Sequence, residues 1–152
     1  MSINSEQAYL RSKASYGGAW KGKLPRNCGP SDCDFWFDNH GRILFCELEI
    51  AINSWEQMEG AQLSVYQSAI RHGEHCAVLC HHNISENRII DNLADVVSFQ
   101  AMVWHWQSFR VSRIIEGNNH WQNFVIAWYR NPDGLRGNII EHSNIINRSW
   151  LK

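Results

Sequence analysis

The chain has 152 residues, of which 44% are hydrophobic and 19% are charged, and its formal net charge is −1. This balance predicts one globular domain over residues 1–152 and excludes a disordered chain. The near-neutral total also excludes a protein that attracts nucleic acid through overall positive charge.

The cellular setting follows from apolar runs and cysteines. No apolar run approaches the roughly 18 residues of a membrane span, and no signal peptide precedes the first expected helix. Five cysteines, an odd number, fit a reducing compartment better than a disulfide framework. We therefore expect a soluble, cytoplasmic protein with no membrane partner. A zinc site from Cys28, Cys33, Cys76 and Cys80 is disfavoured, because C-x4-C and C-x3-C match structural zinc knuckles poorly.

The first thirty residues are expected to form a helix and then a basic loop. Residues 4–14 are typical of a short helix, and residues 15–31 are rich in glycine and lysine, which predicts a long mobile loop. One acid, Glu6, stands against five basic residues: Arg11, Lys13, Lys21, Lys23 and Arg26. Such a basic arm suits contact with a polyanion.

A β-hairpin is predicted around the turn "DNHG", because Asn and Gly tolerate positive φ. Its strands are residues 33–38 and 42–50. If the two loop residues are His40 and Gly41, this register pairs Asn39 with Arg42 and places Asp34 opposite Glu47. Glu49, two residues on, then lies on the same face.

A helix and a third strand follow the hairpin. Ser54 and Gln57 form a capping-box pattern, and Gly73 ends the helix expected over residues 55–71. We expect its apolar stripe to be Met58, Ala61, Val65 and Ala69. Residues 75–81 then read as a buried strand, parallel to residues 42–50 because a helix connects them.

The remaining segments complete an α/β fold. Residues 84–109 are predicted to be largely helical, residues 121–129 to form a late strand, and "NPDG" at 131–134 to be a turn. The expected architecture is a mixed central β-sheet flanked by helices. Residues 31–82 form its expected catalytic core.

Three carboxylates gather at the end of the predicted hairpin. Asp34, Glu47 and Glu49 would repel one another unless a cation lay between them. Carboxylate oxygens are hard ligands that suit Mg2+ or Mn2+. The alternative is an exposed sheet edge protected by charge, but such edges usually carry lysine, and residues 31–60 contain one base, Arg42. The pattern therefore favours a metal site.

These residues and their order resemble the PD-(D/E)XK nuclease superfamily, the restriction-endonuclease-like fold. "CDF" stands where that family often has Pro-Asp-Phe, which makes Asp34 the first metal ligand. Glu47 stands at the second acidic position, and Leu48 would offer its backbone carbonyl. Glu49 stands where the family usually has lysine; some restriction enzymes of this fold use E-x-E and remain active.

A second motif agrees with the resemblance. "QLSVY" matches the Q-x-x-x-Y motif of RecB-like members, here Gln62 and Tyr66. In that family the motif lies on the helix that follows the strand with the second acidic position. The i, i+4 spacing puts both side chains on one helix face. Glu6 stands on the first helix, where many members have an acid.

The resemblance implies a metal-dependent nuclease, with DNA as the expected substrate rather than RNA. Asp34, Glu47, Glu49 and Gln62 are the expected catalytic residues, with Lys21 or Lys23 as candidate substitutes for the missing lysine. Tyr66, Arg26 and Glu6 are expected near substrate. Small members are often dimeric endonucleases, including Holliday-junction resolvases, so a homodimer is expected.

Two alternatives to the nuclease stay open at this point. The first is an inactive nucleic-acid-binding or interaction protein of the same fold, which the missing lysine favours. The second is a metal-binding protein unrelated to nucleic acid. His75, His81 and His82 flank a strand and most such histidines lie on the surface. A serine nucleophile is not indicated, because no G-x-S-x-G elbow is present.

Overall fold

A computed structural model describes residues 33–84 and 92–146. The chain divides into two units, residues 1–32 and 33–152, and every described residue lies in the second. The expected single domain over residues 1–152 stays a prediction. The expected helix at 4–14 and basic loop at 15–31 lie outside the described residues.

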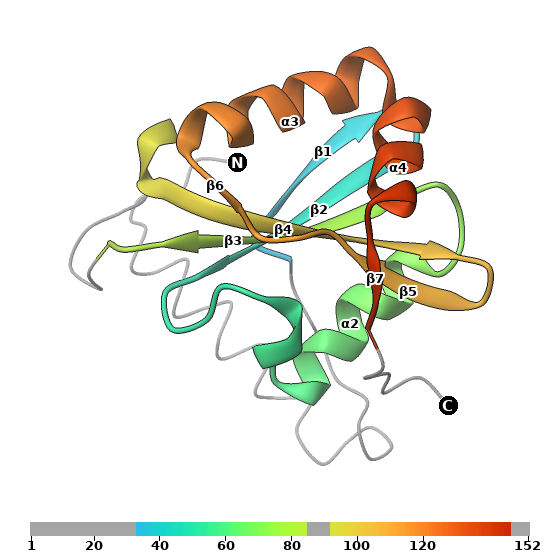
Figure 1. The fold of residues 1–152 in the computed structure, drawn as a ribbon, viewed down its shortest axis with the longest axis horizontal. Coiled ribbons are helices and arrows are strands. Elements are labelled where there is room, and N and C mark those ends of the chain that lie inside the picture. The colour runs from blue at the N-terminus through green and yellow to red at the C-terminus, as the bar shows by residue number, and fades with distance from the viewer. Residues whose placement is uncertain (1–32, 85–91, 147–152) are drawn as a thin grey trace, which may run out of the picture. The chain divides into compact units, whose positions relative to one another are not determined.

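The described residues form a mixed α/β fold with a seven-stranded sheet and three α-helices (Figure 1). The strands are β1 (Phe35–Asn39), β2 (Arg42–Glu49), β3 (Cys76–His82), β4 (Val96–His105), β5 (Ser108–Val111), β6 (Ile115–Glu116) and β7 (Asn144–Ile145). The helices are α2 (Gly60–Ile70), α3 (Asn118–Arg130) and α4 (Pro132–Glu141), with short 3-10 turns η1 (Trp55–Gln57) and η2 (Leu93–Asp95).

The sheet has the strand order β1-β2-β3-β4-β5-β7, with β6 beside β4. β2 runs antiparallel to β1 and parallel to β3, as the sequence predicts, and β4 runs antiparallel to β3. The connection from β2 to β3 contains α2, because parallel neighbours need a crossover.

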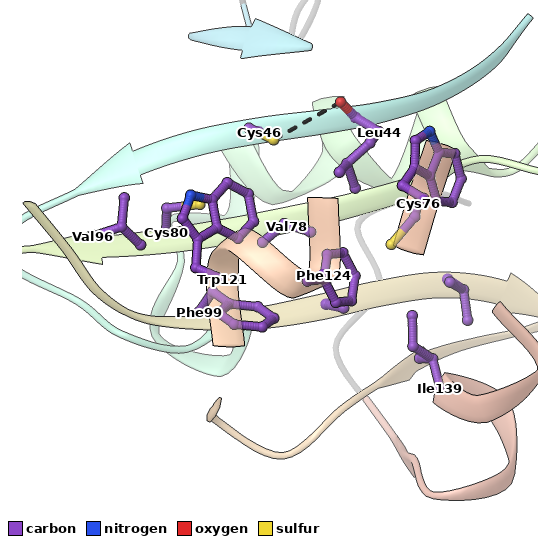
Figure 2. Close-up of a cluster of buried hydrophobic side chains, with 13 residues drawn as sticks. Leu44, Cys46, Cys76, Val78, Cys80, Val96, Phe99, Trp121, Phe124 and Ile139 are labelled. Carbon is purple, nitrogen blue, oxygen red and sulfur yellow. Dashed lines mark hydrogen bonds between the residues drawn. The ribbon is translucent and has the colours of Figure 1, made fainter. Parts of the chain in front are cut away.

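Helices cover both faces of this sheet. Figure 1 shows α3 and α4 on one face and α2 on the other. The strands alternate between the faces, so β2 turns Leu44 and Cys46 toward α3 and α4 and turns Phe45 toward α2. Figure 2 shows the first of these two cores, in which Phe99 on β4 meets Trp121 and Phe124 on α3.

The segment predicted as a helix over residues 84–109 is wrong for its described part. β4 and β5 form a hairpin there, closed by Trp106 and Gln107, both at positive φ. The mistake has a physical cause. Because β4 is buried on both faces along most of its length, its sequence lacks the regular apolar–polar alternation that separates a strand from a buried helix.

The expected late strand at 121–129 is also wrong, because these residues lie in α3. Aromatic and β-branched residues gave the segment strand character. Its buried residues, Trp121, Phe124 and Trp128, instead follow helical spacing. "NPDG" is not a free turn but the start of α4, where the Asn131 side chain accepts a hydrogen bond from the Gly134 N–H at 3.0 Å.

The helix expected over residues 55–71 is shorter than predicted. Its first turn is the separate 3-10 turn η1, and α2 begins at Gly60. The expected stripe is wrong as well: apart from Met58, which lies before α2, its members are not the buried ones. The buried side chains of α2 are Leu63, Tyr66, Gln67 and Ile70. The helix therefore turns its Gln-Tyr motif toward the sheet.

No helix within residues 33–84 and 92–146 is long and apolar enough to cross a membrane.

Candidate functional site

The hairpin register brings the three carboxylates to one end of the sheet. Asn39 pairs with Arg42, and the two loop residues His40 and Gly41 both have positive φ, as expected for the turn. The ladder pairs Phe35 with Cys46, so Asp34, one residue earlier, stands opposite Glu47. The predicted register is confirmed.

Glu47 is the buried centre of this group. It is only 6% exposed, and a buried carboxylate needs hydrogen-bond partners to offset its desolvation. The Gln62 amide donates to one of its oxygens and the Tyr66 hydroxyl donates to the other. Both residues of the Q-x-x-x-Y motif therefore hold Glu47, which fixes the carboxylate between β2 and α2.

Glu49 extends the group toward solvent. Its pKa is raised, first by desolvation and then by the negative charge of Asp34, while a hydrogen bond with Gln62 acts in the opposite direction. Gln62 thus interacts with both acids of the E-x-E pair. The Asp34 and Glu49 carboxylates lie close enough for one charge to affect the other.

Asp34 lies at the exposed start of β1. Its Oδ2 accepts a hydrogen bond at 2.7 Å from the N–H of Leu48, which lies on β2 beyond the start of β1. In a strand the N–H and C=O of one residue point to the same side. The Leu48 carbonyl is therefore directed toward the edge where Asp34 lies.

Sequence reasoning missed the contact between Cys33, which directly precedes Asp34, and Tyr66. Its thiol donates to the carbonyls of Phe35 at 2.9 Å and Cys46 at 3.2 Å, and it also interacts with the Tyr66 hydroxyl. Burial is the main reason that its pKa is raised. The pKa of Tyr66 is raised too, by burial and then by the adjacent Glu47 carboxylate, so the hydroxyl keeps its proton and donates it in the hydrogen bond. No signal in the sequence separates Cys33 from an ordinary strand cysteine.

Tyr66 is buried and its hydroxyl bonds to Glu47, which favours a positioning role for this residue over the expected contact with substrate.

Three histidines, His75, His81 and His82, lie at the two ends of β3. His81 pairs with Glu49 in the ladder, and its Nδ1 lies 3.0 Å from the Ile52 carbonyl. The pKa of His82 is lowered by burial and by His81, against the opposing influence of Asp34 and Asp95. His75 lies at the far end, where its Nδ1 accepts from the Ile43 N–H at 3.0 Å. His81 and His82 border the carboxylates and His75 does not.

The acidic group is small for a divalent-cation site. Within residues 33–84 and 92–146, no three His, Cys, Asp or Glu side chains come close enough to hold a metal ion together. Mg2+ is usually held by only one or two carboxylates, with water and substrate oxygens filling its shell. Asp34 and Glu47 supply two carboxylates at this end of the sheet, and Leu48 supplies a backbone carbonyl. Cys28 of the disfavoured zinc set lies outside the described residues.

Four further candidates, Glu6, Lys21, Lys23 and Arg26, lie outside the described residues. All four lysines of the chain do so, and none occurs in residues 33–84 or 92–146. The lysine substitution proposed from sequence therefore stays a prediction.

A separate pocket of about 570 Å³ lies on the α3 and α4 face. Its lining includes Arg113, Phe124, Asn138 and His142 and none of the three carboxylates. It belongs to a different part of the sheet from the carboxylate group.

Comparisons of this chain with protein-family models, with curated proteins and with solved structures found no match. We therefore infer function from the residues and topology described above.

Proposed function

We propose that this protein is a metal-dependent nuclease that hydrolyses phosphodiester bonds, with DNA as its preferred substrate. The observation that supports it best is the pair of hydrogen bonds from Gln62 and Tyr66 to Glu47. Two motifs that were identified separately in the sequence meet at one carboxylate. A chance Q-x-x-x-Y match would have no reason to bond to the proposed metal ligand.

The strand arrangement supports a restriction-endonuclease-like fold. In that family the first acid begins one strand of a hairpin, the acidic pair follows on the next, and the motif helix comes after it. Here Asp34 precedes β1, Glu47 and Glu49 lie on β2, and α2 leads to the parallel β3. We include this fold in the proposal.

The proposed cofactor is Mg2+ or Mn2+, held by the carboxylates of Asp34 and Glu47 and by the Leu48 carbonyl. When bound, such an ion lowers the pKa of a coordinated water and neutralises charge on phosphate. Gln62 and Tyr66 keep the Glu47 carboxylate in one orientation. Glu49, which is hydrogen-bonded to Gln62, would orient that water.

A second candidate function is a nucleic-acid-binding protein of the same fold that has lost activity. The observation in its favour is Glu49, which stands where the family has a lysine that stabilises developing negative charge. No described residue supplies a lysine in its place. The homodimer and the cytoplasmic location stay predictions.

Cleavage of supercoiled, linear and branched DNA, and of RNA, tests the proposal directly. We expect cleavage with Mg2+ or Mn2+, none with EDTA, and none from Asp34→Asn. Asp38→Asn is the matched control, because Asp38 is an exposed carboxylate of the same hairpin that bonds to the Gly41 N–H in the turn. Binding without cleavage by the wild type would favour the inactive alternative. Equal loss in both variants would show that the site is misplaced.

A further inference from the structure

Trp36, in the middle of β1, is exposed without an evident structural role. Its side chain is 62% exposed. The described residues contain six of the eight tryptophans of the chain. The other five make a ring contact or an indole hydrogen bond within the described residues: Trp55, Trp104, Trp106, Trp121 and Trp128. Trp36 makes neither.

The register places Trp36 beside the carboxylate group. It pairs with Phe45, and Asp34 and Glu47 form the next position on the same face, two residues along each strand. Two residues of strand span roughly 7 Å. β1 is also an edge strand of the described sheet, with a neighbouring strand on one side only. The indole therefore lies on the open side of the proposed site.

We propose that Trp36 is a stacking platform for an unpaired nucleobase next to the phosphate that is cleaved. The inference rests on the proposed nuclease function and deepens it, because it names the substrate class. Inside a duplex both faces of a base are covered by its neighbours, whereas a base in a single strand, loop or branch has a free face. The site is then specific for nucleic acid with unpaired nucleotides.

The charges around Trp36 support contact with a base rather than with backbone phosphates. Asp34 and Asp38 flank it along the same face, and both are exposed. Uncompensated phosphates are repelled there, whereas the neutral face of a base is not. Binding through Trp36 is therefore expected to depend on a divalent cation that offsets the acids.

The test measures binding of fluorescein-labelled single-stranded DNA, single-stranded RNA and a blunt DNA duplex by anisotropy, with Ca2+ as the hard cation. Trp36→Ala is expected to weaken single-strand binding roughly tenfold, within the range for loss of one base–aromatic stack, and to leave duplex binding unchanged. Trp36→Phe should keep most of the affinity because it keeps a ring. Trp106→Ala is the matched control, since this residue is 84% exposed at the opposite end of the sheet.

The outcomes separate this inference from the proposed function. Trp36→Ala that binds and cleaves single strands like an active wild type overturns the inference alone. So does an equal loss of affinity for single strands and duplex, or an equal loss in Trp106→Ala. A wild type that neither binds nor cleaves any of the three probes overturns both. Tighter binding of DNA or of RNA by the wild type identifies the source of the unpaired base.

Discussion

The two faces of the sheet bury different chemistry. On the α3 and α4 face, β2 contributes Leu44 and Cys46 to an apolar core built around aromatic rings. On the α2 face the same strand contributes Phe45, then Glu47, then Glu49. Both faces therefore bury an apolar core, and the α2 face also buries the Glu47 carboxylate beside its core.

This difference has a thermodynamic meaning. A buried apolar side chain stabilises the fold by removal from water, roughly 1.5–3 kcal/mol for a large one. A buried carboxylate costs free energy that its hydrogen bonds at best offset. The α2 face carries this cost at Glu47 and directs both residues of the motif toward it. We infer that the apolar cores of both faces maintain the fold and that the acidic end of the α2 face carries the chemistry.

Glu47→Gln gives the largest expected effect on the α2 face. The variant keeps the shape of the side chain and removes the charge, so we expect cleavage to fall on the order of a thousandfold or more. Stability should change little, because the desolvation cost and the charge-assisted bonds disappear together. Initial cleavage rates and urea unfolding measure the two quantities. A variant that unfolds but whose folded fraction cleaves normally would reverse the assignment of the two faces.

Phe99→Ala is the counterpart on the α3 and α4 face. Phe99 is buried against Trp121 and Phe124, so its loss leaves a cavity and should cost about 3–5 kcal/mol. Cleavage per folded molecule should stay unchanged. Tyr129→Ala, at a half-exposed ring on α3, serves as the control and should cost far less. An inactive but fully stable Phe99→Ala would contradict the comparison.

Glu49 sharpens the comparison at its solvent end. If the enzyme works as an E-x-E variant, Glu49→Ala should lose cleavage about as fully as Asp34→Ala, on the order of a hundredfold or more. Calorimetry with Mn2+ should show weaker metal binding in both. If Lys21 or Lys23 supplies the missing lysine function, its Ala variant should lose turnover and still bind Mn2+.

Glu49→Lys restores the family pattern and separates the two candidate functions. If the wild type is inactive and Glu49→Lys cleaves DNA, the protein is a nuclease that has lost its activity. Unimpaired cleavage by Glu49→Ala would instead show that the catalytic pair is misplaced.

Tyr66→Phe removes one support of Glu47 and leaves the ring in the core. The loss of one hydrogen bond to a buried charged group should cost about 1.5–3 kcal/mol of stability. We expect roughly tenfold slower cleavage, because the carboxylate is less well oriented. Thermal unfolding and Mn2+ calorimetry check this. Gln62→Ala is the companion variant, and a double variant whose loss differs from the sum of the two single losses would show that the two donors act together.

The smallest expected effect concerns pH at the far end of β3. The pKa of His75 is lowered by burial and by nearby Arg136, and its Nδ1 accepts from the Ile43 N–H. The unfolded chain therefore binds a proton more readily, and stability should fall as pH drops below about 6.5. His75→Asn should flatten that slope in urea unfolding measured from pH 7 to pH 5. An unchanged slope would assign the effect to other groups.

The sequence predicts the first part of the fold because its signals there are local. A hairpin is set by its turn residues, so Asn39 and Arg42 pair as expected, and the crossover rule then sets the direction of β3. Residues 96–129 lack such signals. The buried run of β4 resembles a helix segment, and the aromatic residues of α3 resemble a strand, until tertiary packing selects between them.

The site was only partly predictable for the same reason. The i, i+4 spacing predicts that Gln62 and Tyr66 share a helix face, but not that the face turns to Glu47. That orientation follows from burial of Leu63 and Ile70 between α2 and the sheet. The contact of Cys33 with Tyr66 joins residues far apart in the sequence and arises only in three dimensions.

The free cysteines on adjacent strands can also serve as labelling probes that report how often the sheet opens. Cys46 on β2 and Cys76 on β3 are fully buried, and burial raises the pKa of both thiols, to about 12 for Cys76. Because both sulfurs are buried, an alkylating reagent reaches them only when the strands separate. Their raised pKa adds to this protection, because thiolate is the reactive form. Half-exposed Cys33 should react earlier. Labelling rates followed by mass spectrometry would then give the lifetime of the closed sheet in water, without denaturant.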